Sequence, residues 1–244
     1  MKKFTKIAIG LSIFFAVIGL VCITLAFAMG LNVDHLREMA KDGELFIGGS
    51  TLIKSEGVYT ANNCTKLDIE FDAGKLTIFY DDVDEIEVRQ NGMQTLSCSL
   101  DGNTLEIKNK DSLFFKSSKG SVMIKIPREL HLEEIDLEIG AGQAEIKELC
   151  VASLEIEVGA GQANLVDVDV KYLGATTGAG QIQAKLVGAE TDYNYDVECG
   201  IGEIKVGNSS FASIGKESHV NQPGAERKLD IECGVGQITI EFQE

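Results

Sequence analysis

The chain has 244 residues, with 22 basic and 38 acidic side chains and a formal net charge of −16 at pH 7. A surface this acidic argues against nucleic acids and anionic lipids as partners, because both carry the same sign of charge. It permits divalent cations, cationic peptides or uncharged glycans, although the absence of tryptophan weakens the case for a carbohydrate platform.

The amino-terminal segment predicts a membrane anchor. Residues 7–33 carry no charged side chain, and a membrane-spanning helix needs ~20 mostly apolar residues. Three lysines precede this stretch and Asp34 follows it, which places the amino terminus in the cytoplasm and the rest outside. The alternative is a cleaved signal peptide ending near Ala26-Phe27-Ala28, but the apolar run exceeds the ~7–15 residues of a signal-peptide core. We therefore expect residues 1–33 to be a cytoplasmic tip and a retained single-pass anchor in the cell membrane.

The next two segments lead up to a regular region. Residues 34–65 read as a juxtamembrane segment that starts with a short helix between Asp34 and Gly43. Residues 66–133 read as an irregular β region that covers the membrane-side end of the regular region. Within it we expect a hairpin turning near Asp101-Gly102 and a strand from Ser121 that stops at Pro127.

Residues 134–244 are a repeat region. The phrase Gly-Ala-Gly-Gln starts at Gly140, Gly159 and Gly178, a period of 19 residues, and diverged copies start at Gly200 and Gly234. A more distant copy runs from 67 to 78. A short fixed period indicates one structural unit copied along an axis, whose repeated residues are usually architectural.

Apolar and polar residues alternate on each side of these glycines. Ile135, Leu137 and Ile139 share one face of a strand, while Asp136 and Glu138 share the other. We predict an all-β fold, a parallel β-solenoid of ~19-residue coils with glycine corners. An antiparallel β-sandwich or meander, with each corner a hairpin, is the alternative. The glycines predicted to be structural are Gly140, Gly142, Gly159, Gly161, Gly178, Gly180, Gly200, Gly202, Gly234 and Gly236.

Stacked copies would align their polar side chains in columns. Two columns are acidic, which we interpret as a solvated face, with bound Ca²⁺ or Mg²⁺ as the alternative; their members are Asp136, Glu155, Asp196 and Asp230, and then Glu138, Glu157, Glu198 and Glu232. A third column predicts an amide ladder through Gln143, Gln162, Gln181 and Gln237, with Glu203 in the same place once. Cys199 and Cys233 share an inward position and are expected to be buried free thiols.

Catalysis finds little support in the sequence. His35, His131 and His219 are far apart and lie in no catalytic motif, and the glycine phrase is not a nucleotide fingerprint because no helix follows it. We predict no enzyme activity, no cofactor and no metal site. Regularity fails at 207–228, a polar stretch interpreted as a surface loop.

From about Lys66 onward, the chain resembles a bacterial family of putative adhesins, the LiaG-like β-strand-repeat membrane proteins. The shared features are the single amino-terminal span, a strand ending at Ile126-Pro127 and repeated Gly-x-Gly units flanked by alternating apolar residues. The resemblance implies a Gram-positive cell-envelope setting and a role in surface attachment or envelope stress. It offers no catalytic residues to transfer.

Three functions follow as hypotheses. The first is an extracytoplasmic binding or scaffold module, in which the outer face or the 207–228 segment binds an envelope protein or glycan. The second is a self-assembling solenoid, a homo-oligomer, because the last copy ends at Ile240 and no capping segment follows it. The third is a glycan-cleaving β-helix enzyme, which needs an acid–base pair that the sequence does not reveal.

Overall fold

The computed structural model describes residues 51–53, 57–92, 96–109, 120–211 and 216–243, all within one compact unit of the chain. The described part is all-β apart from one turn of 3₁₀ helix, η1 (Glu190–Asp192). The predicted anchor at 7–33 and the predicted short helix at 34–43 lie outside the described residues. Among those that are described, no helix has the length and apolar character needed to cross a membrane.

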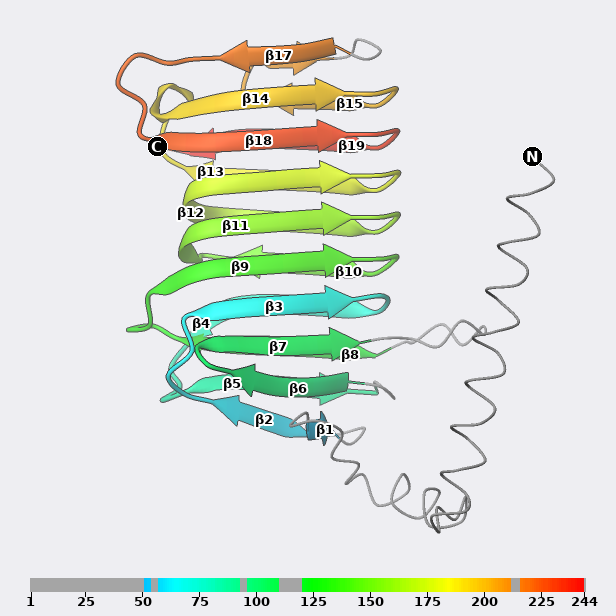
Figure 1. Cartoon of the computed structure of the whole chain (residues 1–244), viewed down its shortest axis with the longest axis vertical. Coiled ribbons are helices and arrows are strands. Elements are labelled where there is room, and N and C mark those ends of the chain that lie inside the picture. The colour runs from blue at the N-terminus through cyan, green and yellow to red at the C-terminus, as the bar shows by residue number, and fades with distance from the viewer. Residues whose placement is uncertain (1–50, 54–56, 93–95, 110–119, 212–215, 244) are drawn as a thin grey trace, which may run out of the picture. The chain divides into compact units, whose positions relative to one another are not determined.

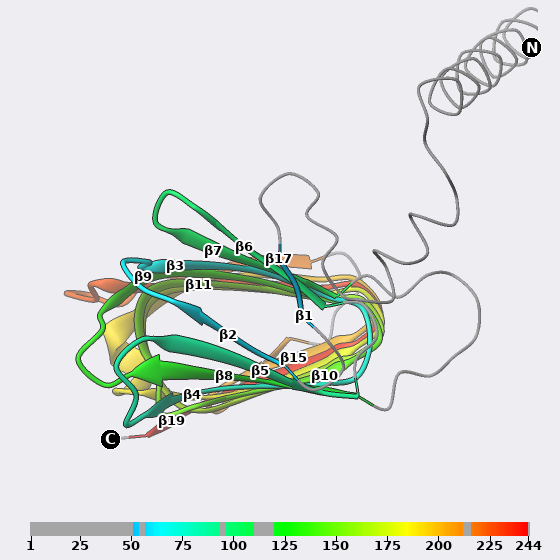
Figure 2. The ribbon, with the colours of Figure 1, turned by 90° about the horizontal axis from the view of Figure 1, so that it is seen from below.

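The strands form two facing layers, here called the first and second sheets (Figures 1 and 2). In spatial order, the first sheet contains β1 (Thr51–Ile53), β6 (Leu96–Asp101), β7 (Thr104–Asn109), β3 (Lys66–Phe71), β9 (Leu132–Ile139), β11 (Cys150–Val158), the second half of β12 (Gln162–Thr177), β18 (Arg227–Cys233), β14 (Tyr193–Cys199) and β17 (Lys216–Val220). The second sheet contains β2 (Val58–Ala61), β5 (Ile86–Asn91), β8 (Ser121–Pro127), β4 (Lys75–Asp81), β10 (Gln143–Lys147), the first half of β12, β13 (Gln181–Val187), β19 (Gln237–Gln243), β15 (Glu203–Val206) and β16 (Ser209–Phe211).

Each coil supplies one strand to each sheet, so the fold is solenoid-like, as the repeat predicts. The coils stack in the order β7–β8, β3–β4, β9–β10, β11–β12, β12–β13, β18–β19 and β14–β15, and all of these neighbours pair in parallel. Antiparallel pairs involve β1, β2, β5 and β6 near one end and β16 and β17 at the other. The sheets are therefore mixed, and the antiparallel sandwich describes only the ends.

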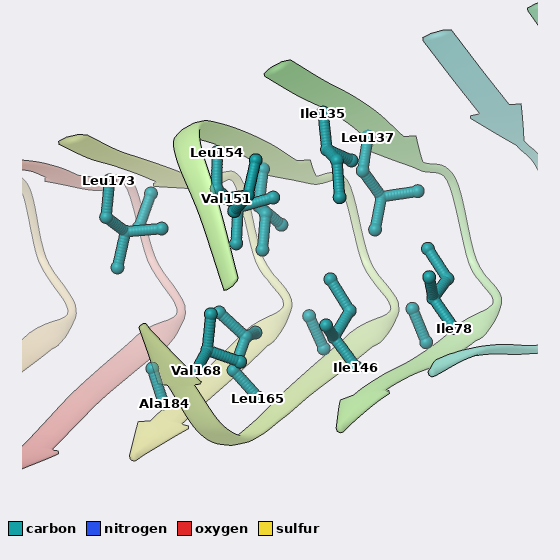
Figure 3. Packing of buried hydrophobic residues seen from close by; sticks show 14 of the residues in the cluster. Ile78, Ile135, Leu137, Ile146, Val151, Leu154, Leu165, Val168, Leu173 and Ala184 are labelled. Carbon is teal, nitrogen blue, oxygen red and sulfur yellow. The ribbon is translucent and has the colours of Figure 1, made fainter. Parts of the chain in front are cut away.

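The core consists of columns of inward side chains, one from each coil. Ile135, Leu154 and Leu173 pair in register in the first sheet, and each is 0% exposed. Ile146 and Leu165 form a matching column in the second sheet (Figure 3). Burying one such side chain stabilises the fold by about 1.5–3 kcal/mol. A coil can bury its inward residues only against its neighbours, which explains why a 19-residue unit folds only as part of a stack.

The coils do not stack in chain order. β18 pairs with β12 on one side and β14 on the other, and β19 pairs with β13 and β15. The last coil of the sequence thus lies inside the stack, and the expectation that it is uncovered is wrong. The opposite end repeats the pattern, because β3–β4 lies between β7–β8 and β9–β10.

The segment 207–228 supplies a cap, which corrects its interpretation as a surface loop. It contains β16 and β17, which pair antiparallel with β15 and β14 and cover the last coil of the stack (Figure 1). Glu217 and His219 are exposed on β17. Charged residues on an edge strand discourage pairing with another chain.

The repeat glycines lie where each coil turns from the first sheet into the second. None of them has a positive φ. Their requirement is close stacking, because a Cβ on Gly159 would lie 3.0 Å from the carbonyl oxygen of Gly140, and one on Gly180 would lie 2.6 Å from that of Gly161. The corner backbones also hydrogen-bond directly, with the amide of Ala160 donating to Gly140 at 2.8 Å. A side chain here would push two coils apart.

Replacing a corner glycine with alanine should therefore destabilise the stack strongly. We expect Gly161→Ala to lower the free energy of unfolding by about 2 kcal/mol or more, because overpacking against backbone costs about 1–3 kcal/mol. Gly174→Ala is the control, since its added methyl would lie 3.4 Å or more from its neighbours, and we expect it to change stability by less than about 0.5 kcal/mol. Urea unfolding monitored by circular dichroism measures both; equal effects of the two variants would contradict the stacking argument.

Candidate functional site

The glutamine column forms the predicted amide ladder along the corner edge of the second sheet. The amide nitrogen of Gln143 donates to Gln162 at 3.3 Å, Gln162 donates to Gln181 at 3.2 Å, and Gln181 donates to Gln237 at 3.2 Å. Gln237 then donates to the carboxylate of Glu203 at 3.1 Å. Because the side chains bond to one another in this way, the column ties coils together and is a poor candidate for ligand recognition.

The carboxylates form two columns on the outer side of the first sheet, here called the carboxylate face. One column passes through Asp68, Asp136, Glu155, Gly174, Asp230 and Asp196, and the other through Glu70, Glu138, Glu157, Thr176, Glu232 and Glu198. The predicted alignment of acidic residues is present. The coil that contains the second half of β12 interrupts both columns with uncharged residues, at Gly174 and Thr176.

These two interruptions produce a hollow in the middle of the carboxylate face. Its volume is about 380 Å³, and Gly174 leaves it open because this residue has no side chain. The acidic residues around it are Asp136, Glu155, Glu157, Asp230 and Glu232. Among the described residues, Glu155, Glu157 and Glu232 make no ion pair. The hollow is therefore a strongly negative region.

Burial and the surrounding negative charge together raise the pKa values of two groups at the hollow. Partial shielding from water, with the charges of Asp68, Glu134 and Glu157, raises the pKa of Asp136. Desolvation, with the charges of Asp230 and Glu155, raises the pKa of Tyr172. A cation placed near such a carboxylate stabilises its ionised form and lowers its pKa.

Toward the two ends of the stack, ion pairs offset part of the charge of the carboxylate face. Asp196 accepts from His219 at 2.7 Å and from Lys228 at 2.9 Å, and these hydrogen bonds lower the pKa of Asp196 and raise that of His219. Near the other end, Lys108 lies 2.9 Å from Glu70 and Lys66 lies 2.7 Å from Glu134. Among the described residues, Asp68, Glu138 and Glu198 of the same columns also make no ion pair, so negative charge extends along the face and includes the hollow at Gly174.

The described residues do not support a metal centre. No group of His, Cys, Asp and Glu side chains within them is arranged to hold an ion. The parallel strands hold the carboxylates in a row, roughly 4.8 Å apart, and do not wrap them around one point. This arrangement suits contact with an extended cationic partner better than chelation of a single Ca²⁺.

The remaining candidates from the sequence are dispersed. His219 lies in the β17 cap, whereas His131 lies in the β8–β9 connection, where its Nδ1 is 3.2 Å from the carbonyl oxygen of Glu129. The acid–base candidates of 207–228 separate as well, because Arg227 binds Asp169 at 2.7 Å, away from His219. Cys199 and Cys233 are paired in register, buried and free, as predicted.

Comparison with known proteins gives a family and a fold. The sequence profile of the family described as Toastrack DUF4097 matches residues 64–244. No match is found among curated proteins. Of solved structures, a putative cell adhesion protein from Clostridium sporogenes is 17% identical, with a TM-score of 0.53, over 77% of this chain and 99% of its own.

Two further structures are more distant. A putative adhesin from Bacteroides fragilis is 15% identical, covering 76% of this chain and 95% of its own, with a TM-score of 0.37. One from Parabacteroides distasonis is 13% identical, covering 82% and 98%, with a TM-score of 0.33. At these identities the likeness to the Clostridium sporogenes protein concerns the fold.

Two members of one acidic column, Asp136 beside the hollow and Asp196 near one end, should respond oppositely to loss of charge. At pH 7, Asp136→Asn should raise the free energy of unfolding, because it removes a repelled charge. Asp196→Asn should lower it, because it removes the partner of His219 and Lys228.

The difference in free energy of unfolding between each variant and wild type should become smaller as the pH is lowered. Asp136 has a raised pKa and is protonated in the folded protein below the usual 3.8, so the gain from Asp136→Asn vanishes there. Asp196 has a lowered pKa, and its stabilising charge is lost only as the pH falls through that lower value. Urea unfolding between about pH 7 and pH 3 checks both signs; a destabilising Asp136→Asn at pH 7 would refute the repulsion.

Proposed function

The chain belongs to the Toastrack DUF4097 family, and we propose that it is a non-catalytic, membrane-anchored binding and scaffold module on the outer side of the bacterial cell membrane. The observation that carries this proposal is the carboxylate face with its unpaired acidic groups around Gly174. The apolar segment at 7–33 supports the anchor. An adhesin-like role in surface attachment, or one in envelope stress, is in keeping with the family resemblance.

The carboxylate face suits a partner that presents several cationic groups in a row. A single exposed ion pair contributes only about 0.2–1 kcal/mol, so useful affinity requires several pairs made together. The stacked strands hold the carboxylates in fixed positions, which lowers the entropy lost on binding. The negative electrostatic potential of the carboxylate face would also speed the association of a cationic segment of an envelope protein, or of a glycan that carries amino groups.

Self-assembly, the alternative predicted from the sequence, loses its original argument. That argument required an uncovered last coil, whereas β18–β19 lies between two other coils and β16 and β17 cover the end. Light scattering on the purified chain measures the oligomeric state directly. Assembly that persists after neutralisation of the carboxylate face would favour the alternative.

A charge-neutralised variant tests the proposed function. Octalysine serves as a defined cationic probe in isothermal titration, and we compare wild type with the triple variant Asp136→Asn, Glu155→Gln, Asp230→Asn. We expect the triple variant to bind octalysine about 5–30-fold more weakly, from three exposed ion pairs. The matched control is Asp82→Asn, Asp84→Asn, Glu241→Gln, which removes three acids outside the carboxylate face and should retain wild-type affinity.

The same two variants are then used in cells. Crosslinking in intact cells should capture envelope partners with wild type and the control, and fewer with the face variant. Equal binding of octalysine by both triple variants, or equal capture of partners, would show that the carboxylate face is not the binding surface.

A further inference from the structure

A second hollow lies on the flank of the stack opposite the glycine corners. We call it the flank pocket; it has a volume of about 500 Å³ and is formed around Cys150 and Ala152 by Tyr80, Leu130, Arg128 and Lys171. These residues come from the end of β4, the β8–β9 connection and the points where β11 and β12 enter the first sheet. It shares no residue with the hollow at Gly174.

The register of three strands explains why the flank pocket exists. Leu132, Val151 and Val170 pair in line and point into the core. The next residue on β11 is Ala152, which points outward. The register pairs on either side of it place Ala152 between Glu133 on β9 and Lys171 on β12, both of which have longer side chains. A short side chain between longer ones leaves a hollow, and Leu130 and Ala152 give it an apolar lining.

The walls are held in place by hydrogen bonds. The Tyr80 hydroxyl lies 3.0 Å from the carbonyl oxygen of Cys150 and 3.3 Å from that of Leu130. On the opposite side, Arg227 donates to Asp169 at 2.7 Å and to the carbonyl of Val187 at 3.1 Å. The cavity is therefore bounded by groups whose positions are already fixed before any ligand arrives.

The charge balance of the flank pocket is the opposite of that of the chain as a whole. Arg227 neutralises Asp169, and Glu133, the other acid on the rim, makes no ion pair within the part of the chain that the structure describes. Against it stand Arg128 and Lys171, neither of which has an ion pair among the described residues, and His131 is a further rim residue. In a chain with a net charge of −16, two unpaired cations at one apolar hollow are a specific feature.

We propose that the flank pocket binds a small amphiphilic anion, with a carboxylate or phosphate group held by Arg128 and Lys171 and a short apolar part lying against Leu130 and Ala152. A guanidinium can hold such a group with two parallel hydrogen bonds, and an ammonium adds a point charge. This site is independent of the carboxylate face. Burial and the charge of Asp169 raise the pKa of the Cys150 thiol, so it lines the pocket as a neutral group.

Cys150 provides the assay. It is exposed, whereas Cys64, Cys98, Cys199 and Cys233 are buried. The full chain is held in phosphatidylcholine nanodiscs and treated with iodoacetamide, and peptide mass spectrometry reports the alkylation rate of Cys150 alone. Butyl phosphate is the probe, and butylamine and inorganic phosphate are the comparison compounds.

We expect butyl phosphate to slow alkylation of Cys150 about tenfold at ten times its dissociation constant, because the occupied pocket covers the thiol. Butylamine should leave the rate unchanged. Protection by inorganic phosphate at similar concentrations would overturn the amphiphilic part of the proposal and indicate a simple anion site. Vesicles of phosphatidic acid then separate the two sources: protection by vesicles indicates a lipid headgroup, and protection by butyl phosphate alone indicates a soluble ligand.

The double variant Arg128→Ala, Lys171→Ala should lose the protection by butyl phosphate. The control, Lys75→Ala, Arg89→Ala, removes two cations from the second sheet and should keep it. Alkylation without ligand shows that each variant keeps Cys150 accessible, and unfolding curves show that each is folded. Equal protection of the two double variants, or equal protection by butylamine, would refute the proposal.

Discussion

The structure depends on the distance between stacked coils at their corners. Parallel strands pair at about 4.8 Å, and at the corners the backbone of one coil occupies the place where the next coil would put a Cβ. Hydrogen bonds such as that from the Gly159 amide to Ile139 at 2.8 Å continue the strand ladder through the turn. Glycine is required here by contact with a neighbouring coil, although its φ is one that any residue adopts. This close stacking then fixes the register of both sheets.

The same register has opposite consequences on the two sides of the first sheet. Inside, it brings Ile135, Leu154 and Leu173 into contact, which favours folding. Outside, it brings like charges together, which opposes folding. The chain relieves the repulsion with basic partners near both ends and with uncharged residues at Gly174 and Thr176. Repulsion that is only partly relieved leaves free energy that a cationic partner would recover, so the feature that opposes folding is the one on which the proposed binding function rests.

Much of this could be predicted from the sequence, because a strict repeat determines local geometry. The 19-residue period and the alternation of apolar residues gave the coils, their inward columns and the glutamine ladder. The order of the coils could not be predicted. Any two copies of the repeat would pair in the same register, so the pattern does not tell which copies are neighbours in the stack. The pairing of β18 with both β12 and β14 therefore has no signal in the pattern. The coil β7–β8 was also missed, because residues 110–119 separate its two strands.

The flank pocket escaped prediction for a reason that also explains its location. Corner positions must be glycine, inward positions must be apolar, and outward positions on the strands fall into columns that the repeat copies. The connections on the flank have none of these sequence requirements. There the chain differs from coil to coil, with a turn at 128–131, a continuous bend within β12 and the η1 turn. Residues as distant as Tyr80 and Lys171 meet on this flank because stacking brings together what the sequence separates. A solenoid that keeps its corners and core uniform can therefore vary its chemistry chiefly along this side.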